Sequence, residues 1–268
     1  MTTLNHLNAY DADFHVAEIY DQYETELDDV NFICKLIENP GPIKILEPFC
    51  GTGRILIPLA LDGQTVVGMD QSAAMLNRAR QKIQQLPLEV QERINLAQSD
   101  VLCDCEAWAQ GFDLVILGYN CFYELATPDE QKRCVRFAFQ SLKPGGHVFI
   151  DNNHMEGGLS LSWQDIGVIQ PSLRGKCSDG TIVESTRETI WFDAPRRLAR
   201  FRRYTKVTLK DGNVIEQEYI QQKHPVSKDE VQDWLEKQGF IVEGVYGNYD
   251  GMPYRVKSPR AIFCARKR

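Results

Sequence analysis

Three acidic residues and two glycines stand at or just after the ends of short apolar runs, where they could bind one polar ligand. The acids are Glu47, Asp70 and Asp100, and the glycines are Gly51 and Gly53. Each run is short, apolar and bounded by turn-forming or polar residues, which is typical of a buried strand. Because the carboxyl ends of parallel strands meet at one edge of a sheet, we expect these five residues to share a pocket.

The loop Cys50-Gly51-Thr52-Gly53 turns a strand into a helix and lets a ligand approach the backbone closely. A dinucleotide fingerprint would require a third glycine at the position where Leu56 stands. A pyrophosphate, being an anion, would also gain nothing from the acid Glu47 before the loop. The pattern therefore favours a ligand that carries an ammonium group. The alternative is a plain strand–helix turn with an exposed Glu47.

The two later acids suit a nucleoside. Asp70 follows the glycine loop by roughly 20 residues and could accept hydrogen bonds from both hydroxyls of a ribose, although alone it could simply open the helix at Ser72. Asp100 with Val101 fits the rim of an adenine pocket, where the carboxylate binds the exocyclic amine and the apolar side chain packs on the ring. The alternative for Asp100 is a loop residue that caps the next turn.

Strands and helices alternate from Ile43 to Asp151, and this alternation predicts the frame that positions the acids. We expect strands at Ile43–Glu47, Thr65–Met69, Ile94–Ala97, Phe112–Leu117 and His147–Asp151, with helices at Gly53–Leu61, from Ser72 and at Asp129–Leu142. Two further strands, Phe240–Tyr246 and Ala261–Ala265, follow a helix that opens at the capping box Ser227–Glu230. The predicted fold class is α/β, with a doubly wound, mostly parallel seven-stranded sheet.

The strand–helix rhythm breaks after the fifth strand. Thr181–Phe192, Arg197–Leu209 and Asn213–His224 are β-runs joined by turn sequences, so residues 160–225 are expected to form an antiparallel β insertion. Residues 1–40 carry a helical pattern of apolar residues and are expected to form an N-terminal helical cap. No boundary has the composition of a free linker, so residues 1–268 are expected to form a single domain.

Four motifs in this order resemble the class I S-adenosylmethionine (SAM)-dependent methyltransferase family. They are Leu46–Arg54, Val67–Ser72, Gln98–Asp100 and Leu142–Gly146, and the resemblance covers Ile43–Asp151 and Ser227–Lys267. It implies a Rossmann-like fold and SAM as the cofactor. It also implies an enzyme of the small-molecule type, which transfers a methyl group to nitrogen or oxygen by in-line displacement.

The resemblance implies a place for each motif residue. Glu47 and the backbone of Gly51–Gly53 would hold the methionyl part of SAM, Asp70 the ribose, and Asp100 with Val101 the adenine. Ile19–Tyr23 resembles a Tyr-Asp-x-x-Tyr segment of small-molecule members, in which an aromatic hydroxyl closes over the cofactor; the alternative is that its tyrosines only pack on the core. The cofactor pocket is expected to contain Tyr20, Glu47, Phe49, Gly51, Thr52, Gly53, Arg54, Asp70, Gln71, Met75, Asp100, Val101, Gly118, Tyr119 and Asn120.

The loop after the fourth strand is expected to face the methyl acceptor. Asn120–Glu124 resembles an Asn-x-Phe-x-His stretch of small-molecule members, with Glu124 where a histidine linked to catalysis is common. Glu124 or Tyr123 is therefore a candidate base, and His154 after the fifth strand is a third candidate. The alternatives are a loop charge near the following helix for Glu124 and a purely structural loop role for His154.

The insertion is expected to roof the acceptor pocket, and it carries the basic run Arg196–Lys206. Strand alternation places Arg200 and Arg202 on one face and Phe201 with Arg203 on the other. One interpretation is a solvated face balanced by glutamates on neighbouring strands. The others are an arginine that binds a carboxylate or phosphate on the acceptor, and an RNA-binding strip.

Composition limits the partners. The net charge of −7 argues against nucleic acid, for which a basic surface normally supplies the affinity. No run approaches the roughly 18 apolar residues of a membrane span, and the N-terminus lacks the pattern of a secretory signal. We therefore expect a cytoplasmic monomer or homodimer with a small-molecule acceptor and no membrane partner.

The eight cysteines lack zinc-type spacing, so no metal is expected. An RNA or protein methyltransferase and a non-catalytic SAM-binding module are the alternative functions.

Overall fold

The computed structural model describes residues 14–37, 41–103, 108, 111–153 and 161–268. Its helices are α1 (Phe14–Tyr23), α2 (Asp28–Leu36), α3 (Leu56–Leu61), α4 (Ala73–Ile83), α5 (Leu88–Gln91), α6 (Pro128–Ser141), α7 (Leu161–Gln164) and α8 (Lys228–Gln238), with a 3-10 turn η2 (Cys121–Glu124). Its strands are β1 (Lys44–Glu47), β2 (Thr65–Asp70), β3 (Ile94–Gln98), β4 (Phe112–Leu117), β5 (Leu142–Asn153), β6 (Ile169–Lys176), β7 (Ile182–Asp193), β8 (Leu198–Thr208), β9 (Val214–Lys223), β10 (Phe240–Tyr246) and β11 (Arg260–Lys267). Within the described part of the chain, no helix has the length and apolar character needed to cross a membrane.

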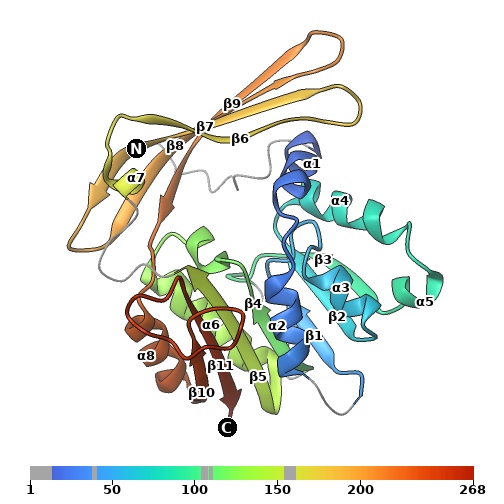
Figure 1. Ribbon diagram of the computed structural model, residues 1–268, viewed down its shortest axis with the longest axis vertical. Helices are drawn as coiled ribbons and strands as arrows, with labels where there is room; N and C mark the ends of the chain where they lie inside the picture. The colour runs from blue at the N-terminus through green and yellow to red at the C-terminus, as the bar shows by residue number, and fades with distance from the viewer. Residues whose placement is uncertain (1–13, 38–40, 104–107, 109–110, 154–160) are drawn as a thin grey trace.

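The main sheet has seven strands in the order β10-β11-β5-β4-β1-β2-β3, which confirms the predicted α/β fold class (Figure 1). The pairs among β1 to β5 are parallel, whereas β11 is antiparallel to both β5 and β10. The strand order reverses between β1 and β4. Open α/β sheets bind their ligands at such a reversal, in the crevice outside the carboxyl ends of the strands.

Two predicted element boundaries shift by three residues or more. The helix expected from Gly53 begins at Leu56, because the residues after the glycine loop form successive turns before regular α-helix starts. The strand expected from His147 begins at Leu142, because Leu142 already pairs with Phe112 of β4 before a shift of register. Neither change moves the carboxyl end of a strand away from the predicted site.

A second sheet follows β5 and has the antiparallel order β6-β7-β8-β9. Figure 1 shows it spanning the top of the molecule, apart from the main sheet. The β-runs expected from Thr181 onward are β7, β8 and β9, whereas β6 was not predicted. Its pairing with β7 shifts register between Pro171 and Leu173, which is tolerated because β6 is an edge strand and pairs on one side only.

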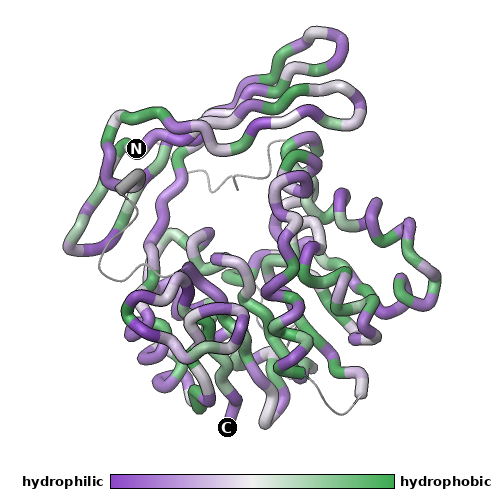
Figure 2. The backbone as a smooth tube through the Cα atoms, viewed as in Figure 1, coloured by the Kyte–Doolittle hydropathy of each residue, from purple (hydrophilic) through white to green (hydrophobic). Residues whose placement is uncertain are grey.

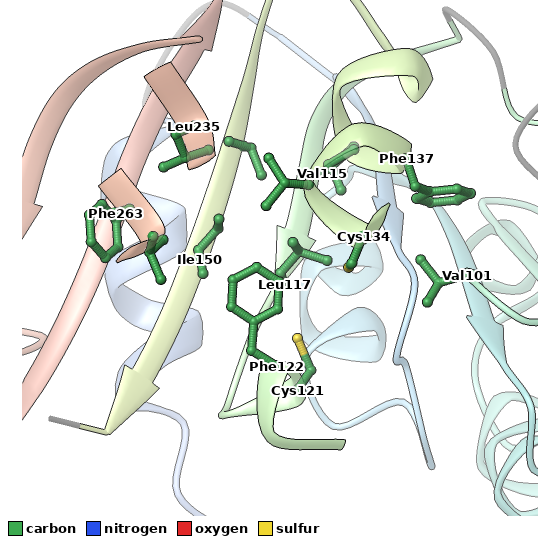
Figure 3. Close-up of a cluster of buried hydrophobic side chains, with 14 of the residues drawn as sticks. Val101, Val115, Leu117, Cys121, Phe122, Cys134, Phe137, Ile150, Leu235 and Phe263 are labelled. Carbon is green, nitrogen blue, oxygen red and sulfur yellow. The ribbon is translucent and has the colours of Figure 1, made fainter. Parts of the chain in front are cut away.

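The main sheet is packed on both faces. Ile45 and Leu46 are neighbours on β1 but belong to opposite hydrophobic clusters, as strand alternation requires. One cluster joins the sheet to α6 and α8 through side chains such as Phe122 and Phe263, and Figure 3 shows this packing. Full burial of each large side chain contributes about 1.5–3 kcal/mol. Figure 2 shows hydrophobic colour along the main strands and alternating colour in the smaller sheet.

The N-terminal helical pattern forms two helices, α1 and α2, with a non-helical stretch between them. α1 lies between the two sheets and bonds to the smaller one. The Tyr23 hydroxyl donates to the carbonyl of Arg174 at 2.7 Å, and the Ser178 amide donates to Glu18 Oε1 at 2.7 Å. α1 therefore fixes the smaller sheet relative to the main one.

Candidate active site

A cavity of about 930 Å³ lies at the carboxyl ends of β1, β2 and β4 and reaches the smaller sheet at Arg187 and Lys223. Cavities that bind small molecules run from about 300 to 1,000 Å³, so this one is at the upper end of that range. All the predicted cofactor residues line it except Gly53, and so do Tyr123 and Glu124. His154 lies outside the described residues.

The glycine loop has the backbone that only its two glycines allow comfortably. Gly51 has a φ of 53° and Gly53 a φ of 81°, both in the left-handed region. A side chain on Gly51 would meet nothing within 4 Å, whereas one on Gly53 would meet Ile57 at 3.1 Å. Gly53 therefore shapes the turn without lining the cavity. The close helix–strand contact is made at Gly68 instead, where a Cβ would lie 2.6 Å from Leu56.

Glu47 is only 5% exposed, so it is not the exposed residue of a plain turn. Its Oε2 is buried and has no hydrogen-bond partner among the described residues. Burial raises the pKa of its carboxyl well above the usual range, and the nearby Arg54 guanidinium and a hydrogen bond from the Leu56 backbone offset this only in part. A buried carboxylate with one oxygen left without a partner is destabilising unless a donor or a cation reaches that oxygen. Because Glu47 lines the cavity, an ammonium group is the chemical complement of this position.

Asp70 connects the ends of β1 and β2. Its Oδ2 accepts from the Gly51 amide at 2.9 Å, and its Oδ1 accepts from the Ser72 amide at 2.8 Å. A carboxylate oxygen can accept more than one hydrogen bond, so these bonds are compatible with a ligand that donates to Asp70 from the cavity, which Asp70 lines. The role of helix entry and a role in ligand binding are therefore compatible in one side chain.

Asp100 likewise combines the two roles expected as alternatives. Its Oδ1 accepts from the Leu102 amide at 2.8 Å, which caps the turn after β3, and Asp100 itself lines the cavity. Val101 beside it is 2% exposed and belongs to the hydrophobic core. The pair thus presents a polar group next to an apolar wall.

The end of β4 is strained. Tyr119 and Asn120 have φ values of 47° and 65°, in a region that residues other than glycine seldom adopt. Hydrogen bonds from the end of β5 hold this turn: the Asn153 amide donates to Asn120 Oδ1 at 2.5 Å, and the Asn120 amide donates to the Asp151 carbonyl at 2.9 Å. The strained turn directs η2 along the cavity wall.

Two aromatic rings flank the cavity near Glu47. The Arg54 guanidinium lies 4.5 Å from the centroid of the Tyr119 ring, and Tyr20 of α1 lines the same wall. Burial raises the pKa of the Tyr20 phenol, and burial together with Glu24 raises the pKa of Tyr119 to about 12. Both phenols therefore remain neutral hydrogen-bond donors at physiological pH.

Glu124 is ion-paired rather than free. Lys223 Nζ lies 2.7 Å from its Oε1, and Gln221 Nε2 donates to its Oε2 at 2.9 Å. Burial alone would raise the pKa of this carboxyl, but Lys223, Arg203 and the hydrogen bonds outweigh burial and lower the pKa below its ordinary value. Glu124 is therefore held in its ionised form and is a weak base.

Tyr123 is also engaged. Its hydroxyl donates to the Asn153 carbonyl at 2.7 Å, and burial raises the pKa of its phenol. Its ring packs edge-on against Trp163, which also lines the cavity. The side chain is therefore placed as a wall and a positioning group.

Comparison with known proteins agrees with this architecture. Residues 45–146 match the family model described as a methyltransferase domain. The methyltransferase CcbJ of Streptomyces caelestis superposes with a TM-score of 0.70 at 18% identity, covering 97% of this chain and 98% of that one. Residues 45–146 therefore form a methyltransferase domain, and the chain has the fold of SAM-dependent methyltransferases of known structure.

Two other relatives differ in what they methylate. A ubiquinone biosynthesis O-methyltransferase of Vibrio atlanticus is 27% identical over 120 residues, which cover 45% of this chain and 47% of the relative. The match thus spans about half the length of this curated relative. SAM-bound CalS10, an amino pentose methyltransferase of Micromonospora echinaspora, has a TM-score of 0.62 at 17% identity, covering 93% of this chain and 94% of that one.

α1 contains a positioning residue that was not among the predicted site residues. Asp21 of α1 accepts from Thr52 Oγ1 at 2.5 Å and forms ion pairs with Arg78 and Lys82 of α4, each at 2.9 Å. Asp21 therefore ties α1 to the glycine loop and to α4. The resemblance of Ile19–Tyr23 to a family segment was the one sequence signal that includes Asp21, and it predicted a role for the tyrosines only.

A second group of side chains that was not predicted supports the strained turn at the end of β4. Asp151 is fully buried; its Oδ1 lies 2.6 Å from Arg260 Nε, and its Oδ2 accepts from the Tyr249 hydroxyl at 2.8 Å. The Arg260 guanidinium also lies 5.9 Å from the Tyr119 ring centroid. These partners are far apart in the sequence, so no local pattern predicts their contact.

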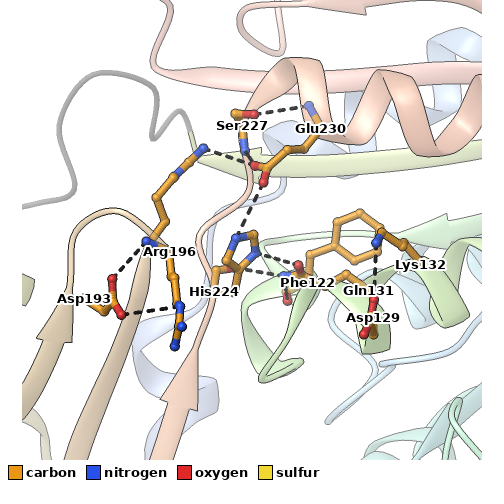
Figure 4. A network of polar contacts seen from close by, with 10 residues as sticks. Phe122, Asp129, Gln131, Lys132, Asp193, Arg196, His224, Ser227 and Glu230 are labelled. Carbon is orange, nitrogen blue, oxygen red and sulfur yellow. Dashed lines mark hydrogen bonds and ion pairs between the residues drawn. The ribbon is translucent and has the colours of Figure 1, made fainter.

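A third missed network holds η2 in place (Figure 4). The buried Gln131 of α6 donates to the Phe122 carbonyl at 2.9 Å and to the His224 carbonyl at 2.8 Å. The His224 ring bonds to Gln131 Oε1 at 2.8 Å through Nδ1, which must be the donor because an amide oxygen can only accept. This network couples η2 to the segment that enters α8.

Proposed function

We propose that this chain is an enzyme that transfers the methyl group of SAM to a nitrogen or oxygen atom of a small molecule. The observation that carries the proposal is the buried Glu47 oxygen, which lines the cavity beside the glycine loop and has no partner among the described residues. The ammonium group of SAM is the cation that this position requires. The similarity to a SAM-bound methyltransferase supports the same assignment.

The remaining cofactor residues suit the other parts of SAM. Asp70 would accept from the ribose hydroxyls, and Asp100 with Val101 would hold the adenine at the end of β3. Bound SAM supplies a methyl group on a sulfonium centre that is open to in-line attack. The aromatic rings of Tyr20 and Tyr119 stand where a cation would be favoured by their electron-rich faces.

The acceptor is proposed to enter between η2 and the smaller sheet. Hydroxyl and phenol acceptors must lose a proton during transfer, so they require a base. Glu124 is held ionised by Lys223, and the Tyr123 hydroxyl is engaged with a carbonyl, so we assign both to positioning. An amine can instead bind in its neutral form. We therefore favour nitrogen as the methylated atom, in agreement with the similarity to an amino pentose methyltransferase.

Two alternatives are weaker on physical grounds. An RNA or protein acceptor needs an open surface, whereas this cavity is walled by α1 and the smaller sheet. A non-catalytic SAM-binding module would need no second compartment, whereas the lining continues beyond the cofactor residues to Trp163, Arg187 and Lys223.

The proposal is tested by incubating the full chain with methyl-labelled SAM and panels of amines, amino acids, phenols and tRNA. Transfer to an amine, lost in Asp70→Ala, is the expected result. Calorimetric SAM binding without transfer to any class would favour the non-catalytic module. Absence of SAM binding would refute the proposal.

A further inference from the structure

The two faces of the smaller sheet carry different charge patterns. On the outer face, acids and bases pair across strands: Arg202 lies 2.7 Å from Glu188 and 3.5 Å from Glu218. The same face also carries the register partners Glu184, Lys206 and Glu216. The outer face is therefore balanced, as the first interpretation of the basic run expected.

The inner face carries cations without acids of its own. Its charged residues are Arg187 of β7, Arg203 of β8 and Lys223 of β9. The other described residues on the inner face of these three strands are apolar or uncharged. Arg187 and Lys223 line the cavity. Arg203 does not line it directly, but it donates to Gln221, which does. Sequence alternation placed Arg203 on this face correctly but gave no reason to connect it with Arg187.

Two of these cations are direct neighbours. Arg187 and Arg203 are opposite one another in the β7–β8 register, and like charges in that position destabilise a sheet. Their guanidinium carbons lie 5.1 and 6.0 Å from the centroid of the same ring, Phe201. Burial, and then the charge of Arg203, lower the pKa of Arg187. Arg187 also donates to Gln170 Oε1 at 2.9 Å, a neutral partner that does not offset its charge. An anion that reaches two like charges held this close together is stabilised by both.

The carboxylate that the described contacts bring to this group is Glu124. It pairs with Lys223 at 2.7 Å, and Gln221 bridges it to Arg203 with bonds of 2.9 and 3.1 Å. Glu130 also lines the cavity, and Arg197 pairs with it at 3.1 Å. Two carboxylates against these four cations leave this end of the cavity positive. The opposite end carries the acids of the cofactor site, so the cavity has a negative end and a positive end.

We propose that Arg187 and Arg203, assisted by Lys223, bind an oxyanionic group of the methyl acceptor. This inference rests on the proposed function and names the acceptor class: a small molecule that carries a carboxylate or a phosphate away from the methylated atom. The planar guanidinium fork matches both groups through two parallel hydrogen bonds.

The test uses the full chain saturated with S-adenosylhomocysteine and two probes, inorganic pyrophosphate and malonate, titrated by calorimetry. At least one probe should bind the wild-type chain, and Arg187→Gln and Arg203→Gln should each weaken it by about tenfold, the scale of one lost charge-assisted bond. Arg202→Gln is the matched control, because it neutralises the adjacent residue on the outer face and should change affinity less than about twofold. The probe that binds more tightly distinguishes a phosphate from a carboxylate acceptor.

Binding of neither probe, or equal weakening by Arg202→Gln, would overturn the inference. SAM affinity measured on every variant separates the two proposals, because Arg187→Gln and Arg203→Gln should retain it. A wild-type chain that binds a probe but no SAM would refute the proposed function alone. If Arg203→Gln does not fold, Arg203→Lys keeps the charge but not the fork and should weaken the probe by about threefold.

Discussion

Replacing Glu47 should stabilise the SAM-free chain while weakening SAM binding, two effects of opposite sign. Glu47→Gln keeps the shape of the side chain and removes its charge. Leaving a buried charged group unpaired costs about 1–3 kcal/mol or more, and a neutral amide is less costly to bury. A domain of this size shifts its melting temperature by roughly 2–4 °C per kcal/mol. The SAM-free variant should therefore melt a few degrees above wild type at pH 7.

The pH dependence of this difference has a defined sign. Burial raises the pKa of Glu47 in the folded chain above its ordinary value of 4.5, so the folded state binds the proton more tightly than the unfolded state. The stability of the wild-type chain should then fall as pH rises from about 4.5 through the raised pKa. The difference in melting temperature between variant and wild type should be largest at neutral pH and should close near pH 4.5.

SAM binding should show the reverse effect. Hydrogen bonds to charged groups contribute about 1.5–3 kcal/mol, so calorimetry should find SAM affinity reduced by roughly 10- to 150-fold. Glu18→Gln is the matched control: Glu18 is also buried, but its Oε1 accepts from the Ser178 amide at 2.7 Å away from the cofactor loop. Glu18→Gln should have a lower melting temperature than wild type and should bind SAM with the affinity of wild type. The reasoning is refuted if Glu47→Gln melts below wild type at every pH, or if it binds SAM as tightly as wild type does.

Three further changes test other parts of the site. Asp70→Ala should lower SAM affinity by about 1–3 kcal/mol through lost ribose contacts, and unchanged calorimetric affinity would contradict the ribose role. Asp21→Asn should weaken SAM binding several-fold and speed hydrogen exchange in α1, because its carboxylate holds Thr52 and two cations of α4; unaltered exchange would show that α1 is held by other contacts. Glu124→Gln should lower stability by about 1–3 kcal/mol at pH 7, because it leaves the 12% exposed Lys223 without its carboxylate. The pKa of Glu124 lies below its ordinary 4.5, so its stabilising effect is present above pH 4.5 and is lost as pH falls through the lowered pKa. The melting temperatures of wild type and Glu124→Gln should therefore converge on acidification, and a constant difference between them would contradict this role of Glu124.

The main sheet was predictable because its strands are short apolar runs, each closed by turn residues. β4 and β10 have the predicted ends, and the capping box of α8 is present with both of its hydrogen bonds. β6 was not predictable, because it contains Pro171 and because an edge strand needs little regular alternation. Local patterns thus predicted elements buried on both faces better than those at an edge.

The meeting of the predicted cofactor residues at one cavity was predictable for a related reason. Glu47, Asp70 and Asp100 come from the ends of consecutive strands, whose place in the fold is fixed by topology. The acceptor half depends on contacts between distant segments, such as Glu124 of η2 with Lys223 of β9. No spacing in the sequence encodes such a contact, so Glu124 could be predicted only as a candidate base or a loop charge, without its partner Lys223.

The cationic inner face also bears on why a base is not required. Glu124 and a carboxylate of the acceptor would neutralise two of the three charges of Arg187, Arg203 and Lys223. The remaining positive charge would lower the pKa of an amine on the same acceptor, because positive charge disfavours the protonated form. The acceptor would then be bound as the neutral nucleophile, and Glu124 could remain ion-paired throughout the transfer. Once an amine substrate is identified, Arg203→Gln should move the acidic limb of the kcat–pH profile to higher pH, since kcat reports ionisations in the bound complex. An unshifted limb would mean that the amine loses its proton to a base instead, and would restore the need for one at this site.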